Sequence, residues 1–167
     1  MKGGISIFTC RSASNEDFQT ISSFPRNAEE LYYMSPLLQF PLTSEQLVES
    51  TKNRLKQTVV VDEKGQIRGY ANIYGLEVDK HCWLGNVIVS PAARGTGAAE
   101  TLIRTMIAKA KDELEVQELH LVCHNVNTRG LLFYTKLGFK PYLVEKKTNH
   151  TGQTIAGIRM KLSVTEP

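Results

Sequence analysis

Residues 87–102 read VIVSPAARGTGAAETL: an apolar strand, a proline, a glycine-rich turn and the start of a helix. A turn of this kind presents unpaired backbone N–H groups, and the positive end of the helix dipole, to an anion. Arg94 stands at the start of the turn, where its forked guanidinium can bind phosphate oxygens. We therefore expect this stretch to form a pyrophosphate-binding loop.

The glycines of this turn follow neither of two common phosphate-binding patterns. The P-loop sequence GxxxxGK[ST] is absent. A dinucleotide-binding GxGxxG would need a third glycine where Glu100 stands, and no βαβ unit opens the chain. The turn alone therefore leaves open which phosphate-bearing molecule it binds.

A second segment, residues 125–139, reads NVNTRGLLFYTKLGF. Together the two segments resemble the GNAT acetyltransferase superfamily. Its members carry a Q/R-x-x-G-x-G/A loop, here at Arg94, Gly97 and Ala99, followed by an N-x-x-A-x-x-F-Y-x-x-x-G-F helix. The match is close over residues 58–140, and the expected order of elements extends it to nearly the whole chain. The resemblance implies an α+β fold in one domain, residues 1–167, with a mixed, mostly antiparallel sheet of about six to seven strands flanked by helices.

The resemblance also implies acetyl-CoA as co-substrate, with no metal, and assigns its binding residues. The loop amides would bind the CoA pyrophosphate; they belong to Arg94, Gly95, Thr96, Gly97, Ala98 and Ala99. The sheet would open beside the preceding strand, so that the main chain of Val87, Ile88 and Val89 pairs with the pantetheine arm. Asn127 would hydrogen-bond the pantetheine, and Phe133 would lie at the same site.

By the same resemblance, Tyr134 is the catalytic residue. A primary amine would attack the thioester directly, and a backbone N–H near Val89 would stabilise the tetrahedral intermediate. Tyr134 would then protonate the leaving thiolate as general acid, a role that suits a phenol protonated at neutral pH. No covalent enzyme intermediate is needed. A non-catalytic acyl-CoA-binding module is the alternative reading.

Simpler roles exist for two of these residues. Asn127 is a favourable N-cap for the helix that follows it, a role compatible with binding pantetheine. Tyr134 could be a half-buried residue that packs beside Phe133. Gly130 stands where the family usually has alanine, and it costs the helix about 1 kcal/mol.

The general base is not defined by the sequence. In this family a Glu or His on the strand before the loop often relays the amine proton. Steps of two back from Val89 reach no titratable side chain, and Asn86 is expected on the opposite face. The positions reached are Val87, Gly85 and Trp83. The remaining candidates are Glu77, His81, His124 and an ordered water. We expect the histidines to be solvated.

Composition favours one globular domain, since 41% of the 167 residues are hydrophobic and 22% are charged. The net charge of +3 is too small to favour nucleic acid as a partner. No membrane-spanning run or signal peptide is recognisable, so we expect a cytoplasmic protein without membrane partners. Cys10, Cys82 and Cys123 form no metal-binding or disulfide pattern and are expected as reduced thiols near the core.

The apolar patterns predict most elements. Strands are expected over 5–10, 58–61, 67–74, 82–89, 119–123, 139–146 and 154–162. Helices are expected over 14–22, 29–34 and 128–137, from residue 43 with Leu47, Val48 and Leu55 on its apolar side, and around 102–114. The acceptor would be a small-molecule amine or a protein N-terminus or lysine, between segments 24–40 and 146–154. Four aromatic residues of the first segment would line that site or cover the sheet: Phe24, Tyr32, Tyr33 and Phe40. A homodimer is possible.

Overall fold

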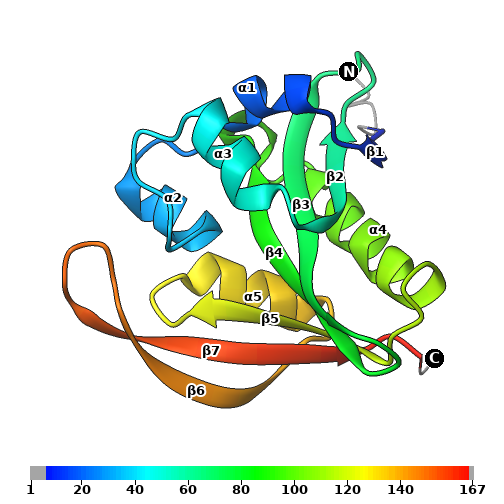
Figure 1. Ribbon diagram of the computed structural model, residues 1–167, viewed down its shortest axis with the longest axis vertical. Helices are drawn as coiled ribbons and strands as arrows, with labels where there is room; N and C mark the ends of the chain where they lie inside the picture. The colour runs from blue at the N-terminus through cyan, green and yellow to red at the C-terminus, as the bar shows by residue number, and fades with distance from the viewer. Residues whose placement is uncertain (1–6, 166–167) are drawn as a thin grey trace, which may run out of the picture.

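The computed structural model describes residues 7–165 and is built on one seven-stranded sheet in the order β1-β2-β3-β4-β5-β7-β6 (Figure 1). The strands are β1 (Thr9–Ser12), β2 (Leu55–Val61), β3 (Ile67–Glu77), β4 (His81–Val89), β5 (Glu118–His124), β6 (Lys140–Thr148) and β7 (Thr154–Ser163). The β4–β5 pair is parallel and the other five neighbouring pairs are antiparallel. The expected mixed, mostly antiparallel sheet is confirmed.

Helices cover both faces of this sheet. They are α1 (Phe18–Ile21), α2 (Ala28–Met34), α3 (Ser44–Thr51), α4 (Ala98–Asp112) and α5 (Thr128–Lys136), with short 3-10 turns at Asn15–Asp17 and Pro91–Ala93. One core lies between the sheet and α4, and α5 packs at its edge. A second core lies under α1, α2 and α3 on the opposite face. Among the helices of residues 7–165, none is long and apolar enough to cross a membrane.

Two expected elements differ from the structure. The first strand runs over Thr9–Ser12 rather than 5–10, and residues 5 and 6 lie outside the described part of the chain. Leu55 is not on the apolar side of α3, because that helix ends at Thr51 and Leu55 opens β2. The intervening Lys52, Asn53 and Arg54 offer no apolar side chain that would continue the buried face of the helix.

Strands β4 and β5 stay together over only three residue pairs. The pairs are His81–Glu118, Cys82–Leu119 and Trp83–His120. Beyond Trp83 the two strands diverge, and β5 pairs along its other edge with β7 (Figure 1). The β5-facing edge of β4 therefore has no strand partner as the chain approaches residue 90, which leaves room for an extended ligand beside it.

A bulge in β4 lies at the same opening. The β3–β4 register shifts between Tyr70 and Asn72, and Asn86 adopts φ 51°, a left-handed value that asparagine tolerates better than most residues. Asn72 Nδ2 donates to Asn86 Oδ1 at 2.8 Å, and Asn86 Nδ2 donates to the carbonyl of Met34 in α2 at 3.2 Å. A buried polar network thus fixes the bulge to its neighbours.

The bulge reverses the alternation of side chains along β4. Before it, Leu84 packs in the core beneath α4. After it, Val87 and Val89 pack against that same core, while Ile88 belongs to the opposite one. The expectation that Gly85 and Trp83 share a face with Val89 is therefore wrong, because the bulge at Asn86 lies between them. Trp83 lies on the α2 side of the sheet.

Candidate active site

The glycine-rich loop between β4 and α4 has the geometry of an anion site. Gly95 and Gly97 adopt φ 75° and 97°, which favour glycine, and α4 begins directly after them. Within residues 7–165, the amides of Gly95, Gly97, Ala98 and Ala99 have no hydrogen-bond acceptor. They lie together at the N-terminus of a 15-residue helix, where an anion is stabilised.

The other two loop amides are used within the loop itself. The N–H of Arg94 donates to Pro91 O at 3.5 Å and that of Thr96 to Ala93 O at 3.3 Å. The Thr96 hydroxyl also donates to the Ala93 carbonyl. These bonds shape the turn and leave four amides, rather than six, available to a ligand.

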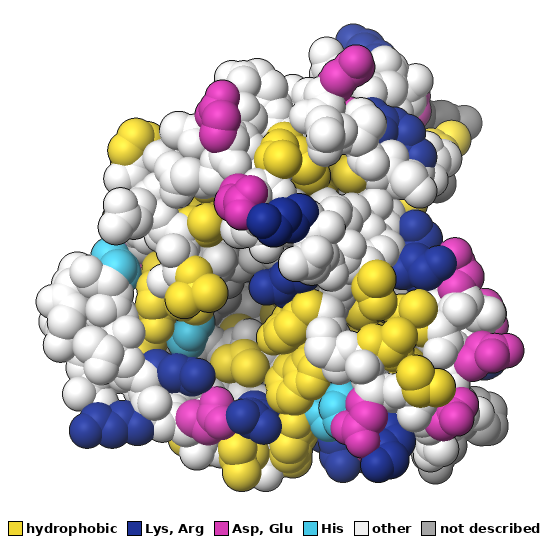
Figure 2. Space-filling model, in the orientation of Figure 1, with side chains coloured by type: hydrophobic (Ala, Val, Ile, Leu, Met, Phe, Trp, Pro, Cys, Tyr) yellow, Lys and Arg dark blue, Asp and Glu magenta, His cyan; other side chains and the backbone are white. Residues whose placement is uncertain are grey.

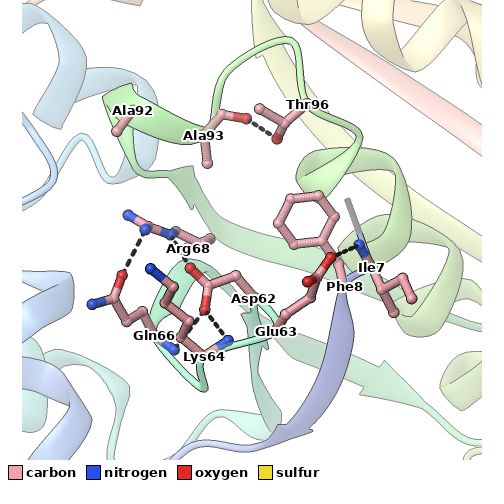
Figure 3. Close-up of a pocket in the computed structure, with 10 residues that line it drawn as sticks. All are labelled: Ile7, Phe8, Asp62, Glu63, Lys64, Gln66, Arg68, Ala92, Ala93 and Thr96. Carbon is pink, nitrogen blue, oxygen red and sulfur yellow. Dashed lines mark hydrogen bonds and ion pairs between the residues drawn. The ribbon is translucent and has the colours of Figure 1, made fainter. Parts of the chain in front are cut away.

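A cavity of about 340 Å³ borders the loop on the side of β2 and β3 (Figure 3). Ala92, Ala93 and Thr96 form one wall, and the β2–β3 turn forms the other. The basic side chain of Arg68 is held there by Asp62 and Gln66. No residue of β4 or β5 lines this cavity, so it is separate from the β4–β5 opening.

The side chain of Arg94 is tied to α2. Its Nη2 donates to Glu30 Oε2 at 2.9 Å, and Arg26 donates to the same carboxylate from its backbone N and its Nε. Burial alone would raise the pKa of Glu30, but the hydrogen bonds from Arg26 and Arg94 outweigh it and lower the pKa to about 2. The carboxylate thus connects the loop with α2 and holds the guanidinium in place.

We predict that this carboxylate contributes to acid stability. The pKa of Glu30 is lowered from 4.5 to about 2 on folding, so its stabilisation is present above pH 4.5 and is lost as the pH falls through 2. The full contribution is about 3 kcal/mol. Urea unfolding at several pH values should show a weaker pH dependence for Glu30→Gln than for the wild type. Glu49→Gln, which removes an exposed carboxylate, should leave the dependence unchanged. Equal curves for Glu30→Gln and the wild type would refute the prediction.

Helix α5 follows β5 and contacts it, and none of its nine residues is buried. Phe133 and Tyr134 are half-buried at the edge of the α4 core. The Tyr134 ring meets Phe133 and Phe139 edge-on, with centroids 5.3 and 5.8 Å away. Burial raises the pKa of Tyr134, and the Cys123 side chain adds to that increase, so the phenol carries its proton at neutral pH.

Asn127 caps α5, and its Oδ1 accepts the N–H of Gly130 at 3.0 Å. A Cβ on residue 130 would lie 2.6 Å from Asn127 Nδ2, so an alanine there would require the Asn127 side chain to shift. The capping role is therefore confirmed. It leaves the donor hydrogens of Nδ2 for another partner.

The expectation of solvated histidines is wrong for His120 and His124, which are 7% and 5% exposed. The alternation of residues along one strand does not show which other elements cover its side chains, so the burial of these histidines was not predictable from it. His120 contacts the Tyr142 hydroxyl at 2.6 Å and Glu118 at 3.1 Å. His124 lies under α2, with its ring centroid 4.7 Å from that of Tyr32. Burial, followed by the charge of Lys147, lowers the pKa of His124, so its imidazole is neutral at pH 7.

The other two base candidates lie at the closed end of the β3–β4 hairpin. His81 Nε2 and Glu77 Oε2 are 3.6 Å apart, and Glu77 also pairs with Lys80. His81 is six residues before Val87, or about 20 Å along a strand. Neither side chain therefore reaches an amine positioned beside residues 87–89.

Segments 24–40 and 146–154 come together, as expected, over the open part of the sheet. The Tyr32 hydroxyl donates to Thr148 O at 3.4 Å, and the Tyr32 and His150 rings lie 5.5 Å apart. Figure 2 shows that this face is hollowed between α2 and the β6–β7 hairpin, with histidine and hydrophobic side chains at its wall. Phe24 belongs instead to the core, and Phe40 is 45% exposed.

A fold with a split sheet, an anion-binding loop and an opposed tyrosine helix defines a class of acyl-CoA-dependent transferases. The family model for the acetyltransferase (GNAT) family matches residues 16–139. The chain therefore belongs to the GNAT family and is an N-acetyltransferase that uses acetyl-CoA as its co-substrate. A search among curated protein sequences found no match.

Solved structures with the same fold include a spermidine N-acetyltransferase from Vibrio cholerae in complex with CoA and spermine. It is 20% identical, with a TM-score of 0.79 over 95% of this chain and 96% of that one. A GCN5-related N-acetyltransferase from Kribbella flavida is 24% identical, with a TM-score of 0.74 over 93% and 97% of the two chains. A GNAT-family acetyltransferase from Bacillus anthracis is 12% identical, with a TM-score of 0.78 over 95% and 96%. These likenesses agree with the fold described above.

Proposed function

We propose that the protein transfers an acetyl group from acetyl-CoA to a primary amine at the opening between β4 and β5. The observation that carries this proposal is the coincidence of three features at one place. The β4 edge beyond Trp83 has no strand partner, four loop amides are free within residues 7–165, and the half-buried Tyr134 packs against the same core as Val87 and Val89. An extended thioester can pair with β4 while its phosphates bind at the N-terminus of α4.

The reaction we propose is a direct displacement. The amine nitrogen attacks the thioester carbonyl, and a backbone N–H of β4 near Val89 stabilises the oxyanion. The C–S bond then breaks as Tyr134 gives its proton to the CoA sulfur. A protonated Tyr134 is the form that this step needs, and burial favours that form.

We further propose that His124 accepts the proton of the amine, directly or through one water. It lies on the acceptor face of β5 beneath the tyrosines of α2, whereas Tyr134 lies on the α5 side. Its imidazole is neutral at pH 7 because burial lowers its pKa. The acid and the base thus lie on opposite faces of the sheet, so that one can serve the sulfur and the other the amine nitrogen.

A histidine substitution tests this assignment. His124→Asn should lower kcat/KM at neutral pH by about 10-fold to 100-fold, and the deficit should shrink toward high pH as more of the amine becomes unprotonated. His81→Asn is the matched control, because His81 lies at the closed end of the hairpin. A deficit in His124→Asn that stays constant with pH would rule out proton transfer by His124.

The function itself is tested by release of CoA thiol from acetyl-CoA with a panel of amines. The panel should hold spermidine, which the Vibrio cholerae relative is named for, together with amino acids and a peptide with a free N-terminus. Product masses should show one added acetyl group. If CoA binds but no amine increases thiol release above hydrolysis, the proposed function is wrong. A cytoplasmic location and a homodimer remain predictions.

A further inference from the structure

The acceptor face of the sheet carries an arginine, Arg54, that has no carboxylate partner among residues 7–165. Arg54 precedes β2, and its guanidinium lies 4.0 Å from the centroid of the Tyr74 ring. Its one hydrogen bond to another residue of the described chain is a long contact of 3.5 Å, from Nη1 to Asn72 Oδ1. Among residues 7–165, the titratable side chains that act on its pKa are Tyr74 and Tyr70, both phenols with raised pKa values, and no carboxylate is among them.

The guanidinium of Arg54 is half-buried and has lost part of its hydration. Desolvation lowers the pKa of Arg54, and stacking on Tyr74 offsets only part of the lost hydration. A guanidinium has five N–H donors; Asn72 Oδ1 accepts from one of them here, and within residues 7–165 no Arg54 nitrogen is both buried and unpaired, so the others face solvent, from which an anion can approach. A bound anion would supply acceptors, and its carboxylate could be held by two parallel hydrogen bonds.

Gly85 lets this guanidinium lie directly against β4. A Cβ at residue 85 would be 2.5 Å from Arg54 Nη1 and 2.8 Å from Tyr74 Cδ1. Gly85 and Val89 lie opposite Asn72 and Gly69 of β3, which are three residues, or about 10 Å, apart along that strand. The positive charge therefore lies within the length of a small molecule from the place proposed for the reacting carbonyl.

The charges nearby make this face positive rather than negative. Tyr74 and Trp83 lie side by side, with ring centroids 6.2 Å apart, and the Arg159 guanidinium lies 5.3 Å from the Trp83 ring. Arg159 and Lys147 share one carboxylate, that of Glu145. The guanidinium groups of Arg54 and Arg159 thus lie beside the Tyr74 and Trp83 rings, at the point where β4 and β5 separate.

We propose that Arg54 binds a carboxylate of the acceptor, so that the acceptor is a compact carboxylate-bearing amine of the amino-acid type. This inference rests on the proposed function and narrows its substrate class. A linear polyamine would meet Arg54 and Arg159 as like charges, which disfavours it as an acceptor. Arg54 is then a specificity-determining residue, since it contacts the substrate away from the reacting atoms.

The test compares proteinogenic L-amino acids with their carboxamides and with spermidine, using kcat/KM for acetylation by the full chain. We expect the preferred amino acid to exceed its carboxamide and spermidine by at least about tenfold, since each charge-assisted hydrogen bond discriminates by this order. Arg54→Gln should lower kcat/KM for the acid about 10-fold to 100-fold and leave that for the amide unchanged. Arg54→Lys should retain part of the preference, because it keeps the charge. Lys52→Gln removes an exposed positive charge two residues away and should have no effect.

Equal turnover of acids and amides, or an equal loss for both in Arg54→Gln, would overturn the inference. If no amine is acetylated, the proposed function fails, and the same compounds are titrated calorimetrically into the CoA complex. Binding of an amino acid but not of its carboxamide, with loss of that binding in Arg54→Gln, would still support a carboxylate site. Absence of any such binding would overturn it.

Discussion

Replacing Tyr134 by phenylalanine is expected to lower kcat for acetyl transfer by about 100-fold to 1,000-fold. The phenol hydroxyl is the one group on α5 that we propose gives a proton to the CoA sulfur. Without it, the thiolate must leave unprotonated or take its proton from water. The ring itself remains packed edge-on against Phe133 and Phe139, so the opening should keep its shape.

The affinity for CoA separates this effect from a structural one. Tyr134→Phe should leave the Kd for CoA within about a factor of two, because the loop amides and the β4 edge are untouched. Tyr142→Phe is a suitable control, since it deletes a tyrosine hydroxyl that contacts His120, where β4 and β5 are still paired, and not the α5 side of the sheet. An unchanged kcat in Tyr134→Phe would remove this residue from the mechanism.

Gly97→Ala is expected to weaken CoA binding by about 100-fold. At φ 97° an alanine is strained, so the loop would turn away from the conformation that directs its amides outward. Hydrogen bonds to a charged phosphate would be lost together with that conformation. The Kd for CoA, measured by calorimetry, is the direct readout.

Gly152→Ala controls for the strain itself. Gly152 has a similar φ of 85° in the β6–β7 turn, and nothing lies within 4 Å of the position of its Cβ or of that of Gly97. Both substitutions should therefore destabilise the fold to a similar extent. Gly97→Ala alone should lose CoA affinity, and equal affinities in the two variants would contradict a phosphate site at the loop.

The sequence predicts those features of the site that depend on local spacing. A strand, two glycines and a helix within residues 87–102 define the loop, because its φ values and its free amides are properties of adjacent residues. The same holds for the Asn127 cap, which acts on the N–H of a residue three positions later. The resemblance to a family then supplies the ligand.

The features that sequence reasoning missed depend on contacts between distant residues. Glu30 meets Arg94 across 64 positions, and no local pattern indicates that pair. The β4 bulge depends on Asn72 in the neighbouring strand, so a regular alternation placed Trp83 on the wrong face. The signal that could have been noticed is Asn86, a polar residue that tolerates positive φ in the middle of an otherwise apolar strand.

A crystal structure of the protein with CoA would decide whether the β4–β5 opening is the acetyl-transfer site. We expect the pyrophosphate to accept hydrogen bonds from the amides of Gly97 and Ala98. The pantetheine should pair with β4, and the sulfur should lie within about 3.5 Å of the Tyr134 hydroxyl. Phosphates bound in the cavity beside Arg68, or a sulfur far from Tyr134, would show that the site lies elsewhere.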